Sequence, residues 1–492
     1  METIHLKTVD HISQELLRSA SKQGLELSWD RFEKLQPQDG FLRLGLSCPF
    51  GCMQGPCRID PFARGAQKGV CGMAKDEMVA GMLLRICLQG AMEALAAIPP
   101  DNRTADIHFS PTLGKMINRV LSKDEQEDLS MDDIFKSTGM LHRPSSSYRT
   151  LLSQALRLSL LTLGLQEQGD TVTDTESKPC AIGYGTIVNQ STRIALSGTP
   201  SAALVGALDE GMKKDGETPR LLVSLGDWIE IEDSFVPISC TTGESELLIS
   251  SGAIHLLVTG PDTEPGLIRL CETMNIPVVS DSDNLEAGDI WQRAQRSLES
   301  RSQLDLFSDA PIVQENQVLT SGDTITQEGK LGNNGNIAVL GGSDNPQLSL
   351  GSLPVALATE LIDKQFQLVG WGDPALWVLK AGALSEEQSI PILAFENRQG
   401  PLHVVKGLES EGQMQRLKGI CFTGLKSCQE VAAAAGLAYL GCRVSVATPI
   451  PIQGSSMVID ALSEMLQSQG GQLLHFDHPA HVGELVEWFT NP

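Results

Sequence analysis

The sequence is poor in aromatic residues and in basic charge. Only 4% of its 492 residues are aromatic, and 37 Lys and Arg stand against 61 Asp and Glu, which gives a formal net charge of −24. A chain this acidic is poorly suited to a nucleic-acid backbone or to an anionic membrane surface. We therefore expect neither nucleic acid nor a membrane among its partners.

Long apolar runs and targeting signals are also lacking. No run of 18 apolar residues occurs, so no transmembrane helix is predicted. The first residues, METIHLKTVDHIS, contain neither the basic nor the apolar region of a secretory signal. We expect a cytoplasmic protein whose cysteines stay reduced. Its 11 cysteines therefore indicate metal or redox chemistry rather than disulfides.

Four of the cysteines lie within 24 residues of one another. Cys48, Cys52, Cys57 and Cys71 follow the pattern C-x3-C-x4-C-x13-C in CPFGCMQGPCRIDPFARGAQKGVCG. Thiolates at this spacing, separated by Gly and Pro, let one loop surround an inorganic core, and a [4Fe–4S] cluster requires four thiolates. Structural zinc is the alternative, but zinc sites usually pair two C-x2–4-C knuckles. We predict that these four cysteines bind a [4Fe–4S] cluster.

The same loop resembles that of a known family. MQGPCRIDPF followed by KGVCG is similar to the cluster-binding loop of anaerobic nickel–iron carbon monoxide dehydrogenase catalytic subunits, relatives of the hybrid-cluster (prismane) proteins. Weaker similarities follow in order, in SGTP, SCTTGESELL, GGSDNP and PIPIQGSSMVIDALSEML. We interpret the chain as a divergent, shortened member of this superfamily, which implies an iron–sulfur oxidoreductase ancestry.

Sequence patterns divide the chain into three parts. Residues from about 75 to 165 have apolar side chains at helical spacing, and after a polar linker at 166–179 short β-rich runs alternate with helical segments. A Gly/Asn-rich stretch at 329–336 marks a second boundary. We predict an α/β protein: a helical domain at 1–175 that carries the iron–sulfur loop at 48–71, then two Rossmann-like doubly wound α/β domains at 176–330 and 331–492. The resemblance implies the same arrangement.

The resemblance also gives the positions of a second, catalytic metal site. Active family members hold a nickel–iron–sulfur cluster there with one His and several Cys on loops that follow strands. The matching positions in this chain, the first of which replaces the His, are Asp227, Cys240, Asp262, Ser343, Asp373 and Cys428, with Cys421 as a second candidate for the last. Oxygen ligands do not suit soft iron and nickel sulfide. We therefore do not expect a nickel–iron–sulfur cluster.

The proton carriers of the family are missing as well. Leu95 stands about where the family has a His, and Val431 stands about where it has a catalytic Lys. Oxidation of carbon monoxide with water needs a general base, so we do not expect the usual reaction. Whether the chain is an enzyme of another kind stays open.

Three interpretations of the altered site stay open. It is a relict pocket whose polar loops are hydrogen-bonded, a remodelled metal site with oxygen and sulfur ligands, or a metal-free pocket for a small ligand. Glu244 is the acid/base candidate in the last two interpretations, and a helix N-terminal carboxylate in the first. Cys87, Cys271 and Cys442 lie on apolar faces, and we expect them to pack in the core.

The N-terminal loop also bears on the oligomeric state. Family members are commonly homodimers that share a bridging cluster held by cysteines just ahead of this loop, yet here only Cys48 precedes Cys52. An alternative alignment matches Cys48 to the lost bridging cysteine and puts Pro49 at the ligand position; we favour Cys48 as the fourth ligand. The partners that we expect are other redox protein subunits, or a second copy in a homodimer without the bridging cluster.

We therefore predict an electron-transfer or scaffold subunit of a larger redox complex, with one N-terminal [4Fe–4S] cluster and a degraded catalytic site. The alternative is a redox enzyme of the carbon monoxide dehydrogenase or hybrid-cluster type, with a remodelled metal site around Cys240 and Cys428. A role in the maturation or regulation of a true dehydrogenase is a third possibility.

Overall fold

A computed structural model describes most of the chain. The described residues are 7–35, 40–98, 103, 107–121, 129–142, 146–169, 177–187, 191–213, 219–283, 285–300, 307, 309–319, 331, 335–382, 392–393 and 400–491. The predicted domain limits at 175/176 and at 330 lie outside the described residues, as does most of the Gly/Asn-rich stretch.

Two long helices form the centre of the N-terminal helical part. Helices α4 (Lys75–Ala97) and α8 (Tyr148–Gln168) pack along each other and against α17 (Cys428–Tyr439) of the C-terminal part. Among the described residues, this part also contains α3 (Gly40–Arg43), α5 (Pro111–Val120) and α7 (Asp132–His142). By length and composition α4 is apolar enough to cross a membrane, but most of its apolar stretch is buried against neighbouring helices. In this structure α4 is therefore a core helix.

In the part of the chain that the structure describes, the larger sheet has eight strands. Its order is β1-β8-β11-β10-β9-β12-β13-β14, with all pairs parallel except the antiparallel pair β1·β8. The strands are β1 (Lys178–Ile182), β8 (Val313–Leu319), β9 (Ile337–Gly342), β10 (Gln367–Trp371), β11 (Ile392–Leu393), β12 (Leu417–Gly424), β13 (Arg443–Val446) and β14 (Gln472–His475). In sequence, β1 precedes the strands of the smaller sheet and β8 follows them, but in space both strands lie at the edge of the larger sheet.

Helices cover both faces of this sheet. Alternate side chains of β9 point to opposite faces, so that Ile337 and Val339 join one core and Ala338 and Leu340 the other. The first core contains α4, α8, α16 (Gly400–Ser410), α17 and α18 (Ser456–Gln467). The second contains α14 (Ser352–Asp363), α15 (Gly372–Lys380) and α19 (Val482–Thr490). This is the doubly wound arrangement.

The smaller sheet is also parallel and covered on both faces. Its order is β3-β2-β6-β7, formed by β2 (Thr192–Ser197), β3 (Arg220–Ser224), β6 (Leu256–Thr259) and β7 (Val278–Ser280). One face packs on α9 (Ala202–Lys213) and α12 (Ala287–Glu299), the other on α10 (Ser245–Ser250) and α11 (Pro265–Thr273). A short antiparallel pair, β4 (Glu230–Ile231) and β5 (Ser234–Phe235), lies beside it.

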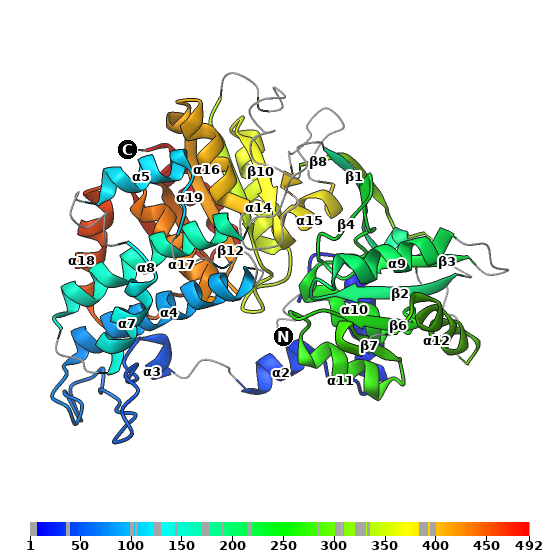
Figure 1. Cartoon of the computed structure of the whole chain (residues 1–492), viewed down its shortest axis with the longest axis horizontal. Helices are drawn as coiled ribbons and strands as arrows, with labels where there is room; N and C mark the ends of the chain where they lie inside the picture. Colours follow the sequence, from blue (N-terminus) through cyan, green and yellow to red (C-terminus); the bar gives the residue numbers. More distant parts are fainter. Residues whose placement is uncertain are drawn as a thin grey trace.

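The N-terminal segment belongs spatially to the smaller sheet. Helix α1 (His11–Lys22) packs against α10, with Leu16 and Ala20 buried in the core of that sheet. Figure 1 shows α2 (Ser28–Leu35) beside α11, away from α3, which lies with the helical part. The predicted fold class, helices followed by two doubly wound α/β units, is confirmed by this architecture and by the structural matches given below.

Candidate functional site

The loops after five parallel strands converge between the two sheets. In the larger sheet β9 has β10 on one side and β12 on the other, and in the smaller sheet β2 lies between β3 and β6. In each sheet, the chain connections run in opposite directions from neighbouring strands. This opens a crevice at the carboxyl ends of the strands, where open α/β sheets bind ligands. The two crevices share one cavity of about 280 Å³, which is lined by Gly198, Asp227, Asp262, Asp344 and Lys426 among others.

A buried ion pair lies beside this cavity. Lys380, on the last turn of α15, donates to the Glu244 carboxylate, and their side chains are 5% and 0% exposed. The Lys380 ammonium lies 4.7 Å from the ring centre of Tyr184 and 4.6 Å from that of Trp377. Burial acts to lower the pKa of Lys380, but Glu244 and Asp10 outweigh it and the pKa is raised, so Lys380 stays charged.

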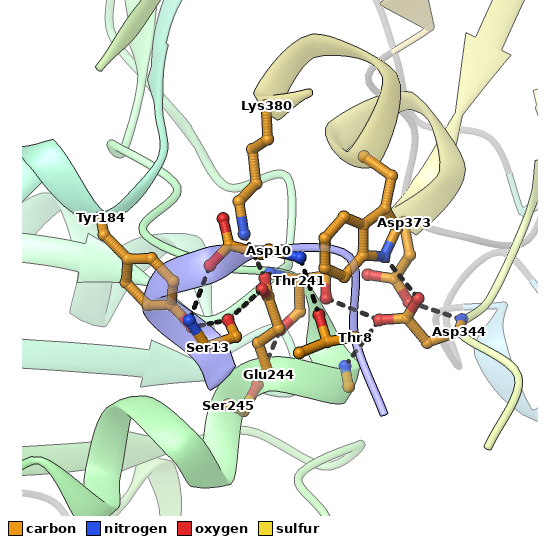
Figure 2. A network of polar contacts seen from close by, with 12 residues as sticks. Thr8, Asp10, Ser13, Tyr184, Thr241, Glu244, Ser245, Asp344, Asp373 and Lys380 are labelled. Carbon is orange, nitrogen blue, oxygen red and sulfur yellow. Dashed lines mark hydrogen bonds and ion pairs between the residues drawn. The ribbon is translucent and has the colours of Figure 1, made fainter. Parts of the chain in front are cut away.

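Glu244 accepts hydrogen bonds from two parts of the chain. Ser13 Oγ, on α1, donates to its Oε1 at 2.6 Å and lies 2.9 Å from the Tyr184 hydroxyl. The Thr241 N–H donates to Oε2 at 3.0 Å, and the Thr241 side chain completes a capping box with Glu244. Figure 2 shows Ser13, Tyr184 and Lys380 gathered around the Glu244 carboxylate. Glu244 thus accepts three hydrogen bonds from protein donors.

Two carboxylates from the larger sheet continue the network. Asp344 accepts from Thr241 Oγ1 (2.6 Å), the Gly243 N–H (3.0 Å) and Trp377 Nε1 (2.7 Å) (Figure 2). Asp373 accepts from the Thr242 N–H (2.8 Å), the Thr242 hydroxyl and the Asp344 N–H (2.9 Å).

Close approach of the two sheets shapes this part of the network. A Cβ atom on Gly243 would lie 2.5 Å from Asp344 Oδ2, so the contact requires glycine. Burial, and then Asp373, raise the pKa of Asp344 to about 8, and burial also raises that of Asp373. These carboxyls act as hydrogen-bonded structural groups between the sheets.

The structure brings some of the residues predicted for a second metal site together and places others apart. Asp227 and Asp262 line the 280 Å³ cavity, and Asp373 is next to it through its bond with Asp344. Ser343 instead donates to Glu430 Oε1 at 2.9 Å. Cys240 is buried, and its pKa is raised well above the usual value by burial and then by Glu244.

Cys428 lies elsewhere. It lines a separate cavity of about 430 Å³ that also contains Cys48, Arg43 and Arg85. The alternative candidate, Cys421, is buried on β12. The two retained thiols of the second site, Cys240 and Cys428, thus do not line a common cavity.

The N-terminal cysteine loop is held by backbone contacts. The Cys48 N–H donates to the Cys57 carbonyl (2.9 Å), and the Ile59 N–H donates to the Leu46 carbonyl (3.1 Å). The Val70 N–H donates to Cys57 Sγ at 3.4 Å, the kind of contact that stabilises a thiolate in iron–sulfur loops. Cys48 is buried, Cys57 is half-buried, and Cys52 and Cys71 are exposed.

The donor set of this loop fits an iron–sulfur cluster in type and number, since four thiols lie on one loop. Within the described residues, no three His, Cys, Asp or Glu side chains are arranged to hold a metal ion, and this holds for the cysteine loop and for the interdomain site alike. Cys87, Cys271 and Cys442 are buried, as expected of core cysteines.

Sequence reasoning missed four central residues of the network: Tyr184, Asp344, Trp377 and Lys380. A signal was available for the last two. Asp373, Trp377 and Lys380 are spaced i, i+4, i+7 along α15, so they share one face of that helix. Asp344 directly follows the predicted Ser343, but nothing local distinguishes their roles.

Comparison with known proteins gives sequence matches to parts of the chain. No protein-family profile matches it. A segment of 90 residues, 18% of this chain, is 48% identical to carbon monoxide dehydrogenase 1 of Methanosarcina mazei. A longer segment of 178 residues, 35% of this chain, is 34% identical to the carbon monoxide dehydrogenase of Rhodospirillum rubrum. The matches span 14% and 24% of those two relatives.

Structural similarity extends over the whole chain. Carbon monoxide dehydrogenase IV from Carboxydothermus hydrogenoformans matches with a TM-score of 0.80 and 17% identity, over 99% of each chain. A nickel-free carbon monoxide dehydrogenase from Thermococcus sp. AM4 matches with a TM-score of 0.78 and 18% identity, over 99% of this chain and 96% of the other. The chain therefore has the fold of these enzymes, and parts of its sequence are similar to those of carbon monoxide dehydrogenases.

Proposed function

We propose that this chain is an iron–sulfur protein that keeps one N-terminal [4Fe–4S] cluster, has lost the catalytic nickel–iron cluster, and serves as an electron-transfer or scaffold subunit of a redox complex. Cys48, Cys52, Cys57 and Cys71 would hold the cluster. When bound, such a cluster supplies one-electron redox chemistry. The activity of the related enzymes does not carry over, because the residues around the second site have changed.

The observation that supports this proposal most is the ion pair beside Cys240. The Glu244 carboxylate and the Lys380 ammonium are close enough to that thiol to interact with it electrostatically, and two aromatic rings lie against the ammonium. An ammonium group cannot ligate a metal while it is protonated, and its carboxylate partner already accepts three protein hydrogen bonds. The oxygen-rich loops that replace the family's thiolates are likewise bonded to one another.

Metal analysis and EPR test the proposal. After anaerobic purification we expect about four iron atoms per chain, no nickel, and one S = 1/2 signal on reduction. Cys57→Ser should remove most of the iron and the signal, because it deletes a ligand, whereas Cys271→Ser, at a buried core cysteine, should retain both.

Two further variants distinguish the alternatives. Cys48→Ser should also lose the cluster; an unchanged signal would favour the alignment that assigns no ligand role to Cys48. Cys240→Ala should leave the iron content unchanged. Stoichiometric nickel, or iron beyond four atoms that Cys240→Ala removes, would instead support a remodelled catalytic site and overturn the proposal.

A further inference from the structure

The cysteine loop and its flanks form a basic segment in an acidic chain. Between residues 40 and 75 there are five basic residues and one acidic residue, a net charge of +4, whereas the whole chain carries −24. All five basic side chains are exposed: Arg43, Arg58, Arg64, Lys68 and Lys75. Figure 1 shows this segment, in blue, projecting from the helical part beside α3. The exposed side chains of residues 40–75 are called the loop surface below.

The one carboxylate of this segment is engaged by the loop itself. Asp60 accepts hydrogen bonds from two backbone N–H groups of the loop, at 2.7 and 3.0 Å. By contrast, Arg43, Lys68 and Lys75 form no ion pair within the part of the chain that the structure describes. Arg43 and Lys75 also flank the cysteines in sequence instead of lying among them. Positive charge on the loop surface is therefore available to a second molecule.

Large apolar side chains are exposed on the same surface. Met53 is 98% exposed, Phe62 74% and Val70 72%. The Arg64 guanidinium lies over the Phe62 ring, 5.7 Å from its centre. Apolar side chains that project into solvent among charged groups are typical of protein–protein interfaces, where an apolar centre is surrounded by a polar rim. The loop surface supplies both parts of such an interface.

The charge of the loop surface indicates the kind of partner. A second copy of this chain in a symmetric dimer would bring the same basic surface against itself, and like charges across an interface are unfavourable. A protein with Asp and Glu side chains around an apolar patch would match both the charge and the apolar groups.

The exposed cysteines indicate what such a partner does. Cys52 and Cys71 are exposed on the same segment, so a protein that docks there contacts the loop to which we assign the cluster. We propose that the loop surface is the docking site of a small acidic redox protein. This inference rests on the proposed function, because an electron-transfer subunit requires a partner that exchanges electrons with it.

Calorimetry with the full-length, anaerobically purified chain tests this proposal. The probe is oxidised flavodoxin, a small acidic electron carrier that contains no iron. At low ionic strength we expect saturable binding with a Kd below about 100 µM, and binding about tenfold weaker or more at roughly 0.3 M salt. Absence of binding up to about 0.5 mM flavodoxin would overturn the proposal.

Variants locate the binding. Lys68→Glu combined with Lys75→Glu reverses two charges of the loop surface and should weaken flavodoxin binding about tenfold or more. Lys22→Glu combined with Lys364→Glu is the matched control, because it makes the same charge change at exposed lysines of α1 and at the end of α14; it should bind within about twofold of the unmodified chain. Met53→Ser should weaken binding about threefold or more. Equal binding by the two double variants would contradict the assignment.

Analytical ultracentrifugation tests the competing occupant, a second copy. We expect Phe62→Asp to leave the oligomeric state unchanged; a dimer that this variant dissociates would assign the loop surface to a second copy and overturn the proposal. Circular dichroism and iron content are measured on every variant. Iron without flavodoxin binding would refute the docking site alone, whereas flavodoxin binding by a chain that holds no iron would refute the cluster alone.

Discussion

At the scale of single residues, the main feature of the interdomain site is that its charged groups bond to each other. Lys380 and Glu244 form a buried ion pair, and Asp344 and Asp373 accept hydrogen bonds from the Thr241–Gly243 turn. A buried charge is costly unless it is paired and hydrogen-bonded. Each of these residues therefore depends on its partners.

Lys380→Met removes the ammonium and leaves the Glu244 carboxylate buried without its counter-ion. Loss of one partner of a buried pair typically costs roughly 3–5 kcal/mol of unfolding free energy, and we expect a loss of that size in urea denaturation. The double variant Lys380→Met with Glu244→Gln removes both charges and should recover much of the loss. A decrease below about 1 kcal/mol for Lys380→Met would contradict the burial argument.

Asp344 should make stability depend on pH. Burial, and then Asp373, raise its pKa to about 8, whereas an unfolded Asp ionises near its ordinary value of about 4. Between these values the folded protein holds a proton that the unfolded chain has released. Stability therefore falls as pH rises through this range, by at most about 1.4 kcal/mol per pH unit for one group.

The Asp344→Asn variant has no ionisable carboxyl at this position. Its free energy of unfolding should therefore fall less steeply with rising pH between about pH 5 and about pH 8. Urea unfolding at several pH values measures the slope. Glu411→Gln, at an exposed position in the loop after α16, should keep the slope of the unmodified chain. Identical slopes for Asp344→Asn and the unmodified chain would show that this carboxyl does not carry the effect.

At the scale of elements, the helical part is fixed to the larger sheet by close helix packing. Helices α4, α8 and α17 contact one another, and glycines lie where two of them approach most closely. A Cβ atom on Gly90 of α4 would lie 2.5 Å from the Cys428 carbonyl oxygen, and one on Gly436 of α17 would lie 2.8 Å from the Ser159 carbonyl oxygen of α8. Small residues thus set the distance between these helices.

Gly90→Ala should therefore destabilise the protein, although alanine is the better helix former. Overpacking of this kind typically costs about 1–3 kcal/mol. Gly139→Ala, within α7, is the matched control, because a Cβ atom there meets nothing within 4 Å. It should be neutral or stabilising by up to about 1 kcal/mol in thermal or urea unfolding. Equal effects of the two substitutions would argue against the close packing of α4 on α17.

At the scale of the whole molecule, the chain passes between its parts more often than its sequence pattern suggests. The N-terminal α1 packs on the smaller sheet, and helices α3, α4, α5, α7 and α8 lie with the larger one. Strands β1 and β8 extend the larger sheet from both sides of the smaller one in sequence. The Glu244 carboxylate accepts hydrogen bonds from α1, from its own turn and from α15. These long-range contacts connect the two sheets beside the cavity.

Features that depend on local spacing could be predicted from the amino-acid sequence. Periodic apolar residues predicted the helices and the parallel strands, and the dense cysteine spacing predicted the iron–sulfur loop, whose metal content is untested. Which side chains contact one another depends on the packing of distant segments. Lys380 and Glu244 are 136 residues apart, and Ser13 and Glu244 are 231 apart. Such pairings depend on how two sheets and the N-terminal helix pack, and no local pattern encodes that packing.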